Sequence, residues 1–321
     1  MKYIRVIGAI ILTVIMLRIA RETSRGRPEL VIRSTNGITL EMYTATKGPE
    51  NGTARVSVKV AAANSSDLTP VLRFAEGNST TASDLARYQS RVMTPFDSAE
   101  GVYSIEVNAG TRGDKLLYFV EVTDNTDNIK AQLLQDNGAP FEMKYIGRVP
   151  LFVLVTHIGL MFGTVFCVSM AFLYAWRLVG GSADVRPMAI LFAFATLFAF
   201  IGGYPFGFAM NYYAFNVIWE GVPFGTDATD NKTQILLLFL LFVTASTVGS
   251  LTNRRFGRDL FTPKTVGCLG VAAFLLMLGI YLIPHSIQFS PALTYAVCYS
   301  FIAALALLYL FSYLRMKRSE A

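Results

Sequence analysis

Residues 144–177 read KYIGRVPLFVLVTHIGLMFGTVFCVSMAFLYAWR, and the pattern of the chain changes inside this stretch. Before Pro150 the chain consists of short alternating segments broken by turn residues. From Pro150 to Trp176 it is an almost unbroken apolar run, longer than the about 20 residues that a transmembrane helix needs. The stretch therefore predicts a junction between two parts, a water-facing domain over residues 28–147 and a membrane domain over residues 148–321.

The composition of the whole chain supports a membrane protein. Of its 321 residues 53% are hydrophobic and 16% are charged, and the mean hydropathy is +0.45. A soluble globular domain carries more charge, about 25%. The net charge of +6 comes largely from Lys and Arg at the ends of apolar runs, where such residues set membrane topology. Because the sequence has no basic stripe with interleaved aromatic residues, we expect the lipid bilayer as a partner and no nucleic acid.

Apolar runs of sufficient length predict a helical membrane bundle. Five of them cover residues 150–176, 187–215, 234–251, 266–284 and 291–314. A sixth, shorter run at residues 6–17 follows Lys2 and Arg5 and is typical of a signal sequence. No convincing small-x-small cleavage site follows it, so residues 1–27 are predicted to form an uncleaved anchor. The chain is therefore expected to have about six transmembrane helices.

The distribution of Lys and Arg predicts the orientation in the membrane. These residues are frequent in the loops at 177–186 and 252–265 and in the C-terminal tail, whereas the loop at 216–233 has only Lys232 and the turn at 285–290 has none. Positively charged loops stay in the cytoplasm. We therefore expect a multi-pass protein of the bacterial inner membrane with both termini cytoplasmic and the water-facing domain extracytoplasmic. The arginines after the first span oppose this orientation, but long domains translocate largely regardless of charge.

The water-facing domain has the pattern of a small β protein. In ARVSVKVAA, residues 54–62, three valines alternate with Ser57 and Lys59. About seven such runs with frequent turns predict an antiparallel β-sandwich of the immunoglobulin or fibronectin III type. The domain contains no histidine, no cysteine and no paired carboxylates, so the sequence favours a binding or spacer module over an enzyme. The three cysteines of the chain, Cys167, Cys268 and Cys298, all lie in apolar runs and are interpreted as packing residues.

One predicted span contains the sequence GGYPFG at residues 202–207. Pro205 removes a helix hydrogen bond, and the surrounding glycines loosen the backbone. The residues expected to kink or break this helix are Gly202, Gly203, Pro205 and Gly207. Such a break can mark a substrate site in a transporter or channel. Because the sequence shows no second break and no internal repeat, we favour a simple proline kink.

The loop WEGVPFGTDATDNKTQ, residues 219–234, places polar residues between two apolar runs. With His157 they form the candidate functional cluster, and they are Glu220, Asp227, Asp230, Asn231 and Lys232. Thr229 or Asp230 is expected to cap the following helix. The oxygen atoms could also bind a hard cation, but the spacing is not that of an EF-hand loop. A structural network of caps and ion pairs is the favoured interpretation.

His157 lies seven residues into the second span, roughly 10 Å from its outer end. An ionisable side chain at that depth marks a functional site by default, and a neutral histidine hydrogen-bonded to a neighbouring helix is the equal alternative. His285, the second histidine, follows Pro284 at the outer end of another span. Two imidazoles from facing helices could hold a b-type haem or a metal ion. No further ligand pattern supports this, so the cofactor is left unknown.

Three motifs carry a resemblance to known proteins. GDKLLYFVEVTDNTDN, residues 113–128, resembles a late strand of bacterial immunoglobulin-like and fibronectin III-like modules. KYIGRVPLFVLVTHIGLMF, residues 144–162, and YAFNVIWEGVPFGTDATDNKT, residues 213–233, resemble the junction and the loop of a group of uncharacterised bacterial membrane proteins. The present chain has Asn216 where that group has glycine. The resemblance implies the two-part architecture and the loop, and it implies no reaction.

Three functions follow from these patterns. The favoured one is a non-enzymatic interaction or accessory subunit whose β domain meets other membrane or extracytoplasmic proteins. The second is a haem- or metal-binding protein in electron transfer or ion handling, with a site in the outer leaflet near His157. The third is a transporter or channel that uses the break at Pro205.

Overall fold

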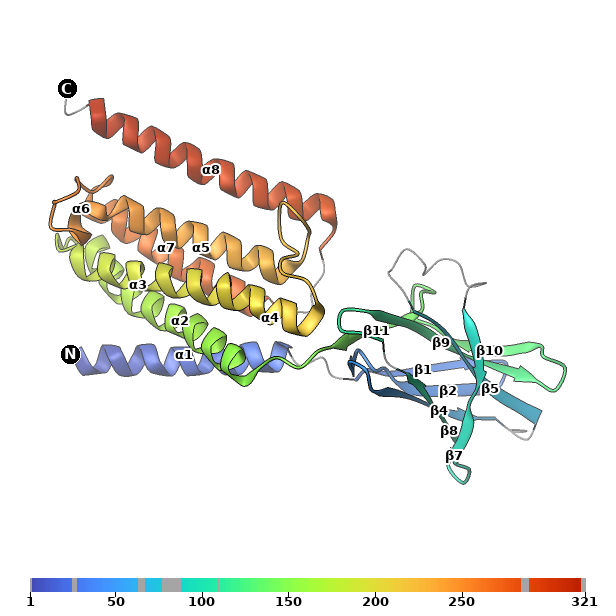
Figure 1. Cartoon of the computed structure of the whole chain (residues 1–321). Coiled ribbons are helices and arrows are strands. Elements are labelled where there is room, and N and C mark those ends of the chain that lie inside the picture. Colours follow the sequence, from blue (N-terminus) through green and yellow to red (C-terminus); the bar gives the residue numbers. More distant parts are fainter. Residues whose placement is uncertain are drawn as a thin grey trace. The chain divides into compact units, whose positions relative to one another are not determined.

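The computed structural model describes residues 2–24, 28–62, 67–76, 88–108, 110–283 and 289–318. The chain divides into two compact units, one helical and one of β structure (Figure 1). The helical unit consists of Met1–Arg25, Pro150–Asn211 and Val217–Ala321, and the β unit consists of Gly26–Val149 and Tyr212–Asn216. The division at Val149 and Pro150 falls where the sequence pattern changes.

Two sheets make up the β unit. The order in the first is β1 (Leu30–Thr35), β2 (Ile38–Tyr43), β4 (Thr53–Ala61), β8 (Val102–Asn108) and β7 (Thr94–Asp97). The order in the second is β3 (Lys47–Pro49), β11 (Phe141–Ile146), β9 (Lys115–Asp124), β5 (Leu68–Glu76) and β6 (Gln89–Val92), and β10 (Ile129–Leu133) also pairs with β9.

These sheets correct the expectation of about seven antiparallel strands. The described residues form eleven strands. The number was underestimated because β3, β6 and β7 are only three or four residues long, too short to show an alternating pattern. In addition β3 pairs with β11 in parallel, so the second sheet is mixed, while the other pairings are antiparallel.

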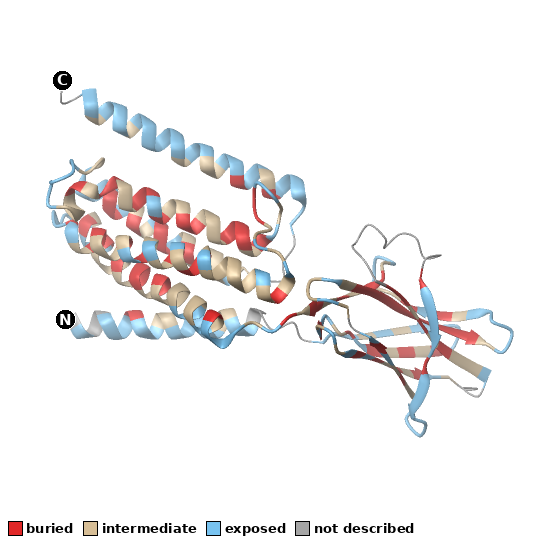
Figure 2. Ribbon diagram, in the orientation of Figure 1, coloured by how far each residue is buried: buried red, intermediate tan, exposed pale blue. Residues whose placement is uncertain are grey.

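Side chains from both sheets form one buried core in the β unit. Leu40 and Val58 come from the first sheet, and Leu72 and Tyr118 come from the second. The alternation of β2 and β4 places every second side chain in this core, as the period of two requires. Strand β9 is buried without interruption over residues 116–123 because its outer face is covered as well (Figure 2).

The helical unit contains eight helices within the described residues. They are α1 (Lys2–Ser24), α2 (Leu151–Val179), α3 (Arg186–Gly203), α4 (Pro205–Phe215), α5 (Ala228–Ser246), α6 (Val248–Leu251), α7 (Pro263–Leu282) and α8 (Pro291–Arg318). The largest differences from the predicted bounds are in two helices. α5 begins at Ala228 rather than at residue 234 and ends at Ser246 rather than at residue 251, and α1 extends well beyond residues 6–17 at both ends.

Four segments of the described chain are long and apolar enough to cross a membrane. They are α2, the consecutive pair α3 and α4, α7 and α8. The apolar runs in α1 and α5 were also predicted to be spans, and neither helix is among the four. In α5 the reason is its polar first turns, which include Asp230, Asn231 and Lys232 and lower the mean hydropathy of the helix.

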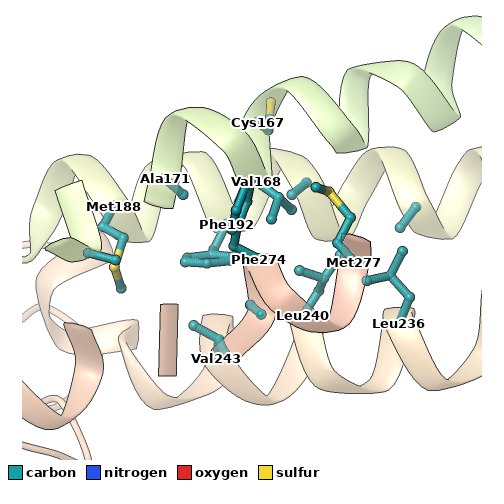
Figure 3. Close-up of a cluster of buried hydrophobic side chains, with 14 of the residues drawn as sticks. Cys167, Val168, Ala171, Met188, Phe192, Leu236, Leu240, Val243, Phe274 and Met277 are labelled. Atoms are coloured by element: carbon teal, nitrogen blue, oxygen red, sulfur yellow. The ribbon is translucent and has the colours of Figure 1, made fainter. Parts of the chain in front are cut away.

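Small residues bring the central helices of this unit close together. The core contains Val168 on α2, Phe192 on α3, Leu240 on α5 and Met277 on α7 (Figure 3). A Cβ atom at Gly270 of α7 would lie only 2.7 Å from Cβ of Ala175 on α2. Small residues at such contacts let helix backbones approach within a membrane. Helix α8 is exposed along most of its length (Figure 2).

Candidate functional site at the start of helix α5

Helix α5 begins with a side-chain cap. Asp227 Oδ1 accepts hydrogen bonds from the backbone N–H groups of Thr229, at 2.8 Å, and of Asp230, at 3.0 Å. These groups are among the N–H groups that lack a partner at every helix start. The prediction that Thr229 or Asp230 caps the helix is therefore wrong. The helix starts earlier than its apolar pattern does, and this moves the cap to Asp227.

Asp230 holds the preceding loop instead. Its Oδ2 accepts a hydrogen bond from the backbone N–H of Glu220 at 2.7 Å. The amide nitrogen of Asn211 on α4 lies 3.2 and 3.3 Å from its two carboxylate oxygens. Asp230 is 8% exposed, so these donors replace the water that its carboxylate loses on burial.

Asn231 makes a second tie to the same loop. Its Oδ1 accepts from the backbone N–H of Val222 at 2.9 Å, and its Nδ2 donates to the carbonyl of Asp227 at 2.8 Å. A backbone hydrogen bond also closes the loop, because the N–H of Asp227 donates to the carbonyl of Glu220 at 2.8 Å. Neighbouring side chains of one helical turn thus fix both ends of the loop 220–227.

The loop itself is compact. Residues 221–225 form a turn in which the N–H groups of Phe224 and Gly225 both donate to the carbonyl of Gly221, each at 2.9 Å. A Cβ atom at Gly221 would lie 2.6 Å from the ring of Trp219 and 3.0 Å from Cβ of Asp230. Only glycine fits between these two side chains without a shift.

Glu220 enters this arrangement through its backbone. Its N–H donates to Asp230 and its carbonyl accepts from Asp227. The sequence predicted a network of helix caps and ion pairs. Among the described residues the network consists instead of a helix cap and of hydrogen bonds between side chains and backbone N–H groups. Its carboxylates bind N–H donors, which is a structural use of their charge.

The long helix is interrupted directly beside this loop. α3 ends at Gly203, Tyr204 adopts φ −104° and ψ −77°, and α4 begins at Pro205. Pro205 has no N–H to donate to the preceding turn, so the helical ladder stops there. The ring of Tyr204 stacks on that of Trp219, with 5.2 Å between their centroids. The interruption and the loop are thereby packed against each other.

His157 on α2 contacts the same interruption. Its Nδ1 lies 2.9 Å from the carbonyl oxygen of Gly202, in the last turn of α3. Carbonyl groups in the last turn of a helix lack helical partners. Because a carbonyl oxygen only accepts, Nδ1 carries the hydrogen. The structure thus contains the hydrogen bond to a neighbouring helix that one of the two interpretations of His157 expects.

Gly203 allows α3 to approach α5. A Cβ atom at this position would lie 2.6 Å from Cγ2 of Thr233. Gly202 similarly faces α2, where an added Cβ would lie 2.9 Å from Cβ of Leu160. Two of the glycines that predicted a kink are therefore also contact points between helices.

Lys232 faces away from the loop network. Its Nζ donates to the carbonyl of Ile283, just after α7, at 2.9 Å, and the residue is 8% exposed. Together with His157 it lines a cavity of about 400 Å³ between α1, α2, α5 and α7. The predicted cluster therefore divides into two parts: a loop network around Asp227, Asp230 and Asn231, and a cavity with Lys232 and His157.

The described residues contain no group of three or more His, Cys, Asp or Glu side chains placed to hold a metal ion. His285, one of the two candidate haem or metal ligands, lies outside the described residues. For His157 the Nδ1 atom is engaged with Gly202.

Comparisons with known proteins add no family. A scan against protein-family models gives no match for this chain, and a search of curated proteins gives none. The resemblance of the junction and loop motifs to a group of bacterial membrane proteins thus remains an interpretation of those motifs.

Sequence reasoning missed Asn211 and Arg21. Asn211 donates to Asp230, and Arg21 of α1 lines the cavity beside His157 and Lys232. An asparagine within an apolar run was the available signal for the first. For Arg21 there was none, because charges that follow a span commonly serve topology.

Proposed function

We propose that this chain is a multi-pass protein of the bacterial inner membrane that presents its β unit outside the cell membrane as a non-enzymatic interaction or accessory module. In this proposal α1 and α5 join the four apolar segments to give six spans, and both termini are cytoplasmic. The β unit is proposed to be an immunoglobulin-like or fibronectin III-like sandwich. Its partners are other membrane or extracytoplasmic proteins.

Three features support the orientation and the number of spans. Lys and Arg gather in the loops at 177–186 and 252–265, and a cytoplasmic location suits them. Helix α5 has 19 residues and is apolar from Ile235 onward, so its capped polar start suits a position at the membrane surface. Helix α1 has 23 residues, enough for a span.

One edge of the β unit carries the functional proposal. Between β6 and β7 the chain leaves the second sheet and joins the first, and only Met93 at the crossing is buried. On either side of it Val92 and Phe96 are 61% and 65% exposed. Edge strands offer unpaired backbone groups to a partner chain, and exposed apolar side chains beside them supply area for binding. This edge is the surface that we assign to the partner.

Site-specific photo-crosslinking on the full chain in its native membrane tests the proposal. A benzoylphenylalanine at Phe96 should give one discrete protein adduct, and the same partner should be captured from Val92. Ile129 is the matched control because it is apolar and 52% exposed but lies on β10. Equal capture at Phe96 and Ile129, or adducts with lipid alone, would contradict the proposal.

The competing haem function makes a different prediction. A protein that holds haem through His157 should show a Soret absorption band after purification, and the band should disappear in His157→Ala. The interaction proposal expects no such band in the unmodified protein. Elemental analysis of the same sample tests for a bound metal ion.

A further inference from the structure

The cavity between α1, α2, α5 and α7 plays no part in the proposed interaction function. Its volume of about 400 Å³ lies within the roughly 300–1,000 Å³ that is usual for small-molecule sites. Most of its wall is apolar, and the side chains with polar groups are few: Arg21, His157, Thr229, Lys232, Thr233 and Tyr281. A pocket with apolar walls and a few convergent polar groups is the common form of a ligand site.

The polar and apolar parts of the wall are separated along the helices. On α5, Lys232 and Thr233 lie one turn before the apolar Leu236. On α2, His157 lies one turn before Met161. On α1, Arg21 lies one turn after the apolar Leu17 and closer to the C-terminal end of the helix. The cavity therefore has a polar end at the helix termini and an apolar end deeper in the unit.

The charged groups in this wall have one sign. The lining includes the two cations Arg21 and Lys232 and no Asp or Glu among the described residues. Lys232 donates one of its three N–H bonds to the carbonyl of Ile283. A buried ammonium group is costly unless an anion or several acceptors replace its water. An anionic group at the polar end would supply that compensation.

From this arrangement we propose that the cavity binds an acidic amphiphile, with a phosphate or carboxylate head group at Lys232 and Arg21 and a hydrocarbon chain along Met161 and Leu236. The cavity has room for the head group and the first part of one chain. The same chemistry is found in anionic membrane phospholipids and in free fatty acids. Binding of either kind of lipid would place a ligand in the helical unit, independently of any partner of the β unit.

Native mass spectrometry of the delipidated full-length protein tests the proposal. Phosphatidylglycerol, phosphatidylcholine with the same acyl chains, and oleate are added in separate experiments. We expect one tightly bound acidic lipid and at least about tenfold weaker binding of phosphatidylcholine, because its head group has no net charge and its trimethylammonium group would lie against the cations Arg21 and Lys232. Tight binding of phosphatidylglycerol identifies a membrane phospholipid as the ligand source. Tight binding of oleate alone identifies a fatty acid.

Three variants make the test specific. Lys232→Gln should remove the preference for acidic lipids, and Lys232→Arg, which keeps the charge, should retain it. Ile158→Trp should narrow the cavity and weaken binding of every lipid while leaving Lys232 in place. Lys264→Gln is the matched control, because Lys264 is exposed at the other end of α7.

Equal binding of phosphatidylglycerol and phosphatidylcholine would overturn the proposal, because the site would then not select lipids with a net negative charge. An equal loss in Lys232→Gln and Lys264→Gln would assign the preference to general surface charge. If Lys232→Gln does not fold, unchanged binding in Ile158→Trp still overturns the proposed location.

Discussion

The carboxylate of Asp230 accepts a hydrogen bond from the backbone N–H of Glu220, with 2.7 Å between Oδ2 and N. Ten residues separate the two, and the loop between them returns to the first turn of α5. The bond joins a side chain that is 8% exposed to a main-chain donor, so it fixes the loop rather than a substrate. The acidic character of this loop is thereby explained by its own folding.

We predict that Asp230→Ala destabilises the helical unit. The substitution leaves the N–H of Glu220 without its acceptor, and a buried donor without a partner costs about 1–3 kcal/mol. The free energy of unfolding of the full chain in detergent, followed by tryptophan fluorescence, measures this loss. Trp219, which lies in the same loop, is a direct reporter.

Glu220→Gln is the control for this experiment. It changes the neighbouring side chain but keeps the backbone N–H, so its effect should stay within about 0.5 kcal/mol, as is usual for substitutions away from structural features. If the two variants were equally stable, the Asp230 bond would not hold the loop.

In this region the sequence predicted local features, such as the helix interruption, better than the hydrogen bonds between residues far apart in the chain. The GGYP motif predicted the interruption at Tyr204 because Pro205 acts locally, through its own missing N–H. The partner of Asp230 could not be predicted, since it depends on how the loop 220–227 returns to α5. The cap was assigned to the wrong residue because the polar first turns of α5 show no apolar period.

The β unit shows the same limit. Long central strands such as β4 alternate clearly and were recognisable. The strands β3, β6 and β7 are too short to show an alternating pattern, and β3 in addition pairs with a distant segment. The parallel pairing of β3 with β11 joins segments almost one hundred residues apart, as Lys47 and Lys144 illustrate.

We predict that Gly203→Ala separates α3 from α5. The new Cβ would lie 2.6 Å from Cγ2 of Thr233, and such overpacking costs about 1–3 kcal/mol. Thermal unfolding of the full chain measures the loss. Thr233→Ser removes only the obstructing methyl group and keeps the hydroxyl that donates to the carbonyl of Thr229, so the double variant should regain most of the stability.

A glycine without close neighbours provides the control. Around Gly279 of α7 an added Cβ would meet nothing within 4 Å, so Gly279→Ala should be neutral or stabilising, by up to about 1 kcal/mol from helix propensity. Additive effects of Gly203→Ala and Thr233→Ser would show that the two residues do not collide.

Asp124 should make the β9–β10 hairpin sensitive to acid. Its ion pair with Lys130, at 2.7 Å, and hydrogen bonds from Thr126 and Asn128 lower the pKa of this carboxyl group. A lowered folded-state pKa contributes stability that is present above the unfolded pKa of about 4 and is lost as the pH falls below it. We predict that hydrogen exchange of the hairpin accelerates in acid, relative to the β4–β8 pair in the same sample.

The variant Asp124→Asn tests whether the charge of the carboxylate, rather than the hydrogen bonds of the turn, causes the acid sensitivity. It keeps an acceptor for the turn but loses the ionisable group, so its hairpin should be less protected at neutral pH and should show little further change toward acid. An unchanged acid response in this variant would assign the effect to another carboxyl group.

We predict that ionisation of Tyr118 destabilises the β unit at alkaline pH. Burial raises the pKa of its phenol to about 12, and its hydroxyl bonds the backbone of Ala45, accepting from N at 3.0 Å and donating to O at 3.3 Å. The unfolded phenol titrates near about 10. Because the folded pKa is the higher, the stabilisation is complete below pH 10 and is lost as the pH rises toward 12.

The measurement is the protection of β9 amides against hydrogen exchange in the full chain, compared between the unmodified protein and Tyr118→Phe. The variant loses about 1 kcal/mol at neutral pH with the hydrogen bond. Its stability should not fall further between pH 10 and 12 through this position, because phenylalanine has no proton to release. The difference between the two proteins should therefore shrink as the pH rises from 10 to 12. A difference that stays constant over this interval would mean that Tyr118 does not ionise on unfolding and that another group limits the sheet in alkali.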